Sequence, residues 1–139
     1  MLLPAAIARL KSDVPSLRLV GTLAEVDTDA VPSQVPAAYV LPIRDAAAPN
    51  RIAAGSHRQD LTEVFGVLLC VSKPAGRDKA ALDLESLKDE VRQALIGWFP
   101  GDGWTGCDYV GGVLVDAKPG GIVWWLQQFS TSRQIIKHR

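Results

Sequence analysis

The sequence has only two histidines, two cysteines and no excess of charge of either sign. Lysine plus arginine numbers 15, and aspartate plus glutamate numbers 15. Nucleic-acid binding depends on cationic side chains that neutralise phosphates, so this balance argues against a nucleic-acid partner. A net charge of zero also removes the self-repulsion that keeps chains apart, so self-association is permitted.

The two cysteines, Cys70 and Cys107, form no zinc-binding pattern with the histidines. The N-terminus carries Arg9 and Lys11 after its apolar residues rather than before them, which differs from a signal peptide. We therefore expect a reducing compartment and two free thiols, with Cys70 in the core and Cys107 more exposed. No apolar run approaches the ~18 residues that a membrane span needs. No metal, cofactor or membrane partner is predicted.

No set of residues predicts catalysis. His57 begins a strand and is expected at the surface, and His138 lies in a terminal segment that we expect to fray. The glycine-rich segment 101–106 follows a helix, whereas a phosphate-binding loop follows a strand and opens a helix. The carboxylates of residues 83–90 alternate with Lys88 and Arg92 at helical spacings, which is typical of a solvated helix face. The sequence therefore predicts that the chain is not an enzyme.

The length of 139 residues fits one domain, residues 1–139. Helices are predicted at 2–13 and 78–98, with a stripe of Leu84, Leu87, Val91, Ala94, Leu95 and Trp98 on the second. Strands are predicted at 37–43 (ended or edged by Pro42), 57–73, 109–116, 121–129 and, briefly, 135–136.

Residues 57–73 alternate between two faces, with one polar face in the first half and two apolar faces in the second half, which predicts a central strand. The order of elements favours an α+β fold. We expect an antiparallel or mixed sheet with the long helix and the N-terminal helix packed on one face.

Five residues are candidates for an interface with another subunit or a partner protein. Adjacent Trp124 and Trp125 must point to opposite faces of a strand, so one needs a helix, a second sheet or a partner to cover it. Residues 45–56 carry small residues, proline and glycine, and are expected to form a loop that becomes ordered on assembly. The candidates are Arg44, Arg51, Arg58, Trp104 and Trp125.

Several motifs occur together and in order: Pro36 to Pro42, Glu63-x-Phe65-Gly66-Val67, Ala94 to Trp98 with Pro100, Tyr109 to Gly112, and Trp124 to Phe129. This set, over roughly residues 30 to 130, resembles the tail terminator (tail completion) proteins of long-tailed bacteriophages, in the Mu-like and lambda-like group.

The resemblance implies a structural protein without enzymatic activity or cofactor. Such proteins form a six-fold ring on the end of the tail tube, stop its polymerisation and present a surface to head-completion proteins. The implied partners are further copies of the chain, the tail tube protein and the head-completion protein. The implied location is the tail end of the virion, after assembly in the host cytoplasm.

Two other functions fit the residues. The chain could be another phage neck or tail-tube component, which would polymerise into long tubes if it were a tube protein. It could also be a small ligand-binding domain that uses the glycine-rich loop and Trp104, in which case polar groups should converge in a buried pocket.

Overall fold

A computed structural model describes residues 1–52, 55–73 and 77–138 of the chain. The elements follow in the order α1 (Leu2–Asp13), β1 (Leu19–Thr22), the short 3-10 helix η1 (Leu23–Glu25), β2 (Ala37–Ala47), β3 (Ser56–Ser72), α2 (Arg77–Leu95), β4 (Asp108–Lys118) and β5 (Ile122–His138). The five strands form one sheet in the order β1-β2-β3-β5-β4. β1 is parallel to β2, and the other neighbours are antiparallel.

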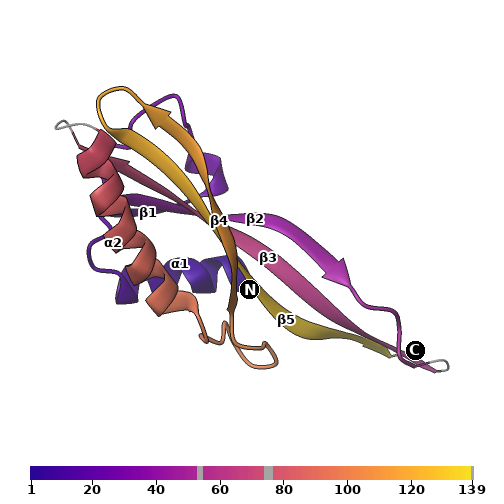
Figure 1. The fold of residues 1–139 in the computed structure, drawn as a ribbon. Helices are drawn as coiled ribbons and strands as arrows, with labels where there is room; N and C mark the ends of the chain where they lie inside the picture. The colour runs from indigo at the N-terminus through magenta and orange to yellow at the C-terminus, as the bar shows by residue number, and fades with distance from the viewer. Residues whose placement is uncertain (53–54, 74–76, 139) are drawn as a thin grey trace.

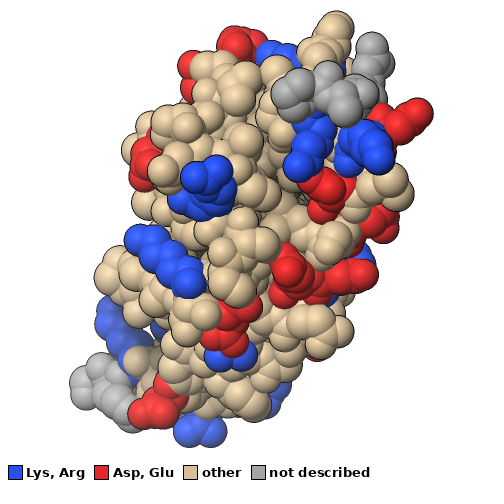
Figure 2. Space-filling view, turned by 90° about the vertical axis from the view of Figure 1, so that its left-hand side faces the viewer, with Lys and Arg blue, Asp and Glu red and all other residues tan. Residues whose placement is uncertain are grey.

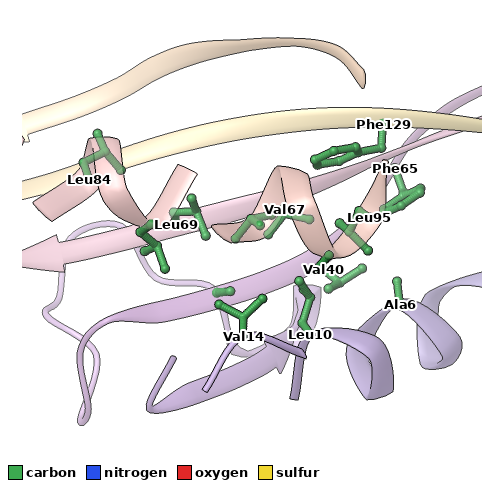
Figure 3. Packing of buried hydrophobic residues seen from close by; sticks show 14 of the residues in the cluster. Ala6, Leu10, Val14, Val40, Phe65, Val67, Leu69, Leu84, Leu95 and Phe129 are labelled. Carbon is green, nitrogen blue, oxygen red and sulfur yellow. The ribbon is translucent and has the colours of Figure 1, made fainter. Parts of the chain in front are cut away.

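Both helices cover the same face of this mixed sheet, which confirms the predicted α+β architecture (Figure 1). β3 lies at the centre of the sheet, as its apolar faces predict. Phe65, Val67 and Leu69 of β3 point toward the helices, where side chains from α1 and α2 meet them (Figure 3). Leu87 and Val91 of α2 are also buried in this core. Each large side chain buried here stabilises the fold by ~1.5–3 kcal/mol.

The opposite face of the sheet has a smaller apolar core. Trp124 is fully buried there, and its ring stacks on Tyr39 with 6.2 Å between centroids. Leu68 and Cys70 complete the buried set, and Val26 from the segment after η1 packs against it. The irregular segment between η1 and β2 therefore takes the place of a second helical layer on this side.

Two details of α2 differ from expectation. The helix ends at Leu95 rather than Trp98, because Gly97 has φ +79°, a left-handed conformation that stops helices and favours glycine. Lys88, predicted to face solvent, is only 9% exposed. Its ammonium lies 4.0 Å from the ring centroid of Trp125 and 3.1 Å from Glu85 Oε1. The long side chain of Lys88 covers the tryptophan while its charge stays paired.

The strands are longer than predicted. β2 continues through Pro42 to Ala47, because β1 pairs only as far as Val40 and leaves the rest of β2 at an edge that tolerates proline. The expected loop 45–56 is therefore wrong at both ends; the connection is 48–55, of which 53 and 54 lie outside the described residues. Residues 135–136 belong to the continuous β5, and His138 pairs with Ser56 instead of fraying. Neither described helix is long and apolar enough to cross a bilayer.

Candidate functional site

The longest strands extend beyond the helices as a three-stranded projection (Figure 1). We call it the arm and define it as residues 44–52, 56–62 and 132–138. β2, β3 and β5 remain paired along it, with Leu61 opposite Arg133. The hydroxyls of Thr62 and Ser132 lie 3.0 Å apart across the strands. Within the described part of the chain, neither α1 nor α2 reaches over the arm (Figure 1).

The arm tip contains two of the candidate arginines. Arg51 N–H donates to the Arg58 carbonyl at 3.0 Å, so the two residues face each other across the turn. The Arg51 guanidinium pairs with Asp60. Asn50 accepts hydrogen bonds from the backbone N–H of Arg58 at 2.9 Å and of Ile52 at 3.2 Å. These contacts hold the described part of the tip, and they leave Arg58 exposed with no ion pair to any described residue.

The base of the arm borders an open groove of about 950 Å³. Arg44 and Trp104, two further candidates, both line it. The groove also includes three carboxylates, Asp45, Glu63 and Asp102. The remaining lining comes from Met1 to Pro4, Pro42, Ile43, Val64, Phe65, Gly103, Arg133 and Gln134. The groove thus joins the N-terminus of α1, the glycine-rich loop and the start of the arm.

Trp104 is held in this groove by Arg133, whose guanidinium lies 5.2 Å from the ring centroid. The backbone before β4 is fixed beside it, since Thr105 N–H donates to the Ser132 carbonyl at 2.8 Å. Trp104 remains half-buried, so part of its ring is open to a partner. An accessible aromatic ring between charged groups is a common feature of protein–protein contacts.

Trp125 lies apart from the other four candidates. Its ring packs under Lys88 of α2 and over Gly112 of β4, where a Cβ would come within 2.7 Å of Trp125 Nε1. The cover that the sequence required for the second tryptophan is therefore largely supplied by α2 of the same chain. The five candidates fall into three places: the arm tip, the groove and the α2–β4 contact.

Sequence reasoning missed the groove residues Glu63 and Arg133. The sequence placed Glu63 in a strand and in a motif of the resemblance but in no interface, and Arg133 was given no role. Their contribution depends on how far β3 and β5 continue past the core, which alternation alone did not reveal. The one available signal was the continued spacing of residues 131–137, in which Arg133 and Ile135 share a strand face.

Both thiols are buried, Cys70 in β3 and Cys107 directly before β4. Burial raises the pKa of Cys70 to about 12 and that of Cys107 to about 11. The expectation that Cys107 is the more exposed is wrong, because Gly97 and Trp98 bond to its backbone and cover it. Protonated, inaccessible thiols are poor nucleophiles and poor metal ligands. Among the residues described, no group of three or more His, Cys, Asp and Glu could hold a metal ion.

The charged side chains of both signs are interspersed on the face that α2 dominates (Figure 2). Ion pairs such as Lys73–Asp83 at 2.9 Å and Arg92–Asp89 contribute to this mixture. Exposed pairs of this kind add ~0–1 kcal/mol each to stability. This face therefore provides no single-sign field to attract a phosphate backbone.

An α+β body with a projecting strand arm, two buried thiols and an open groove fits a protein that works through its surface. The family model for the phage tail terminator protein matches residues 1–139. The chain belongs to the phage tail terminator family, whose members are structural proteins of phage tails. None of the curated proteins matches the sequence.

A solved structure has a similar fold. It is a chain from the virion of a native gene transfer agent (GTA) particle, with a TM-score of 0.62 and 14% sequence identity. The similarity covers 96% of this chain and 95% of that chain. The fold therefore has a counterpart of nearly the same extent.

Proposed function

We propose that this protein is the tail terminator of a phage or phage-like particle. Copies of the chain assemble into a homo-hexameric ring on the end of the tail tube, in the neck of the particle. The ring stops tube polymerisation and provides the surface that head-completion proteins bind. The protein acts by contact rather than catalysis, in the host cytoplasm during assembly and at the tail end of the virion afterwards.

One structural observation supports this proposal beyond family membership: beyond its base, where the groove and Leu61 lie, the arm has a covering layer on neither face within the described chain. The side chains at residues 44–47 are exposed, as are His57 and Arg58. Cross-strand pairs contribute only ~0.2–1 kcal/mol each, so a sheet of this kind gains much from a partner that packs on it. A closed ring with projecting arms places such surfaces on the next subunit and on the tube.

The candidate residues supply specific contacts in this proposal. Arg58 at the arm tip and Arg44 at its base are exposed cations available to acidic groups of the tube or a neighbour. Arg51 positions the tip through Asp60. Trp104 offers an open ring edge in the groove, and Trp125 supports β4 from beneath. Each interface in the ring is expected to bury more than ~1,000 Å² in total.

The test is to grow the phage with the gene disabled and to measure tails by electron microscopy. We expect tails of uncontrolled length that are not joined to heads, and rescue by a plasmid copy of the gene. Normal-length tails attached to heads would exclude the terminator role. Long tubes formed by the purified protein alone would instead indicate a tail-tube protein.

A further inference from the structure

The edge of the sheet formed by β4 differs from the usual edges of soluble proteins, whereas the open part of β2 at the other edge carries Pro42. Natural edge strands are blunted by charges, prolines or cover, because free backbone groups beside apolar side chains recruit other strands. β4 pairs only with β5 among the described strands. Between Tyr109 and Val115 it has no charged residue and no proline. Its pairing with β5 is irregular between Tyr109 and Gly111 and between Leu114 and Asp116, so the stretch from Gly111 to Leu114 is the part of its outer edge open to another strand.

The apolar exposure on this side is concentrated. Four consecutive or near-consecutive residues of β4 are each about half exposed: Val110 at 49%, Val113 at 50%, Leu114 at 51% and Val115 at 48%. Ile96 and Phe99 are also exposed. Their turn lies alongside the start of β4, because Gly97 N–H donates to the Cys107 carbonyl at 2.8 Å. We call these six residues the β4 edge.

The opposite end of the sheet has a second exposed apolar group. Leu23 of η1 is 56% exposed, Val31 in the following segment is 48% exposed and Ile43 of β2 is 36% exposed. We call these three residues the β1 edge. The strand beside them, β1, has only four residues, so β2 itself is an open edge beyond Val40.

We infer that the β4 edge of one copy docks on the β1 edge of the next, so that the sheet continues from subunit to subunit. This rests on the proposed ring and names the surfaces that form it. Strand directions support it. β1 and β4 run in opposite directions within one sheet. A neighbour placed in the same orientation therefore presents β1 antiparallel to β4, the slightly more stable pairing.

Charge complementarity selects a second copy of this chain as the occupant. Asp108 and Asp116 stand eight residues apart, on either side of the apolar part of β4. On the β1 edge, Arg18 lies level with Pro36, because its N–H donates to that carbonyl at 2.9 Å. Arg44 follows eight residues after Pro36, on β2, beyond the irregular pairing between Pro42 and Arg44. In the antiparallel arrangement, Asp116 of one copy comes near Arg18 of the next and Asp108 comes near Arg44, while Asp116 also lies 3.7 Å from Lys118 of its own chain.

This contact joins two different patches, so it is heterologous and closes into a ring when the rotation between copies allows. The test is a double variant, Val110→Cys with Leu23→Cys, assembled onto phage tails and also kept as free protein; with Asp116 beside Arg18, the antiparallel arrangement puts these two exposed positions level. Both samples are oxidised with copper phenanthroline and run on non-reducing gels. The native thiols of Cys70 and Cys107 are buried, so we expect them to form no cross-links in the folded protein.

We expect a ladder of cross-linked species ending at the ring size for the double variant, and monomer for each single variant. Dimers from Val110→Cys alone would overturn the inference, because they would show β4 pairing with β4. Absence of a ladder on particles with normal tails would also overturn it, while leaving the terminator function intact. If tails stay normal when the gene is disabled, the proposed terminator function is wrong. The cross-linking of the free protein then still shows whether the β4 edge contacts the β1 edge.

Charge variants provide an independent readout. Val113→Lys and Leu23→Lys should each lose ring assembly and tail-length control, whereas Leu82→Lys should retain both. Leu82 is a matched control, since it is 66% exposed on α2 and belongs to neither edge. An equal mixture of the two edge variants retains one intact contact, so native mass spectrometry should detect a heterodimer and nothing larger. Full-size rings from either edge variant alone would contradict the inference.

Discussion

The body and the arm share three strands but are stabilised differently. In the body, β3 and β5 are covered by α1 and α2 on one face, and Trp124 lies in a second core on the other. In the arm, the same strands continue with side chains such as Arg58 and Ile136 exposed. The body can therefore fold as a unit, while the arm is held mainly by its continuity with the body.

This difference indicates a division of roles. Core burial in the body supplies the free energy of folding, so substitutions there should act on stability. The arm contributes little burial of its own, so substitutions there should act on assembly. Each prediction below tests whether the two regions separate in this way, beginning with the largest expected effect.

Leu87→Ala should destabilise the body by ~2–5 kcal/mol, because it removes a buried side chain and leaves a cavity beneath α2. Val91→Ala should cost somewhat less. The arm counterpart, Ile136→Ala, should change stability by less than ~0.5 kcal/mol, since that side chain is 46% exposed. Urea unfolding of the purified variants measures all three. Equal losses at Leu87 and Ile136 would mean that the arm belongs to the same core.

Gly112→Ala should destabilise the body by ~1–3 kcal/mol, because the added methyl group would meet the Trp125 ring at 2.7–2.9 Å. The ring cannot retreat easily, since Lys88 lies on its other side. Gly101→Ala is the control, where the new Cβ would meet Trp104 at an ordinary 3.5 Å. Thermal unfolding followed by tryptophan fluorescence compares the two. An unchanged Gly112→Ala melting temperature would refute the described packing of Trp125.

The native thiols report on opening of the body. Cys70 and Cys107 should react with a thiol reagent only after unfolding, while an added Ile136→Cys on the arm should react at once. The kinetics of absorbance change on reagent addition separate the two classes. Rapid reaction of the two native thiols in the folded protein would contradict a closed body.

The same thiols predict a loss of stability at alkaline pH. Burial raises their pKa values from 9.0 to about 12 for Cys70 and about 11 for Cys107. Their contribution is fully present below pH 9 and falls as pH rises toward 11, because only the unfolded chain releases these protons in that range. Substituting both with alanine should flatten this part of the pH profile, measured by urea unfolding. An equally steep fall in the double variant would assign the effect to other groups.

The body was largely predictable from sequence, and the arm was not. Alternation in residues 61–71 and the stripe of α2 identify the core because burial imposes a period on the sequence. The arm has no buried face to impose one, so residues 45–47 and 132–134 gave no clear strand signal. Lys88 was misplaced for a related reason: its cover over Trp125 depends on the sheet edge meeting α2, which no local pattern contains.

The candidate interface was predicted only in part. Arg44 and Trp104 were chosen from separate segments, and the structure brings them to one groove. Their proximity depends on the hairpin register of β2 and β3, including the shift between Pro42 and Arg44. The exposed apolar residues of β4 were assigned to an ordinary hairpin, because an edge strand and an inner strand have the same pattern when both faces are apolar.

The central claim is that a folded body carries an arm whose cover comes from assembly. Hydrogen–deuterium exchange by mass spectrometry, on the free subunit and on the subunit bound to purified tails, tests it most directly. We predict slow exchange in residues 64–71 in both samples, and fast exchange in residues 56–62 and 132–138 that becomes slow only on tails. Arm exchange that is unchanged by tail binding would contradict the account.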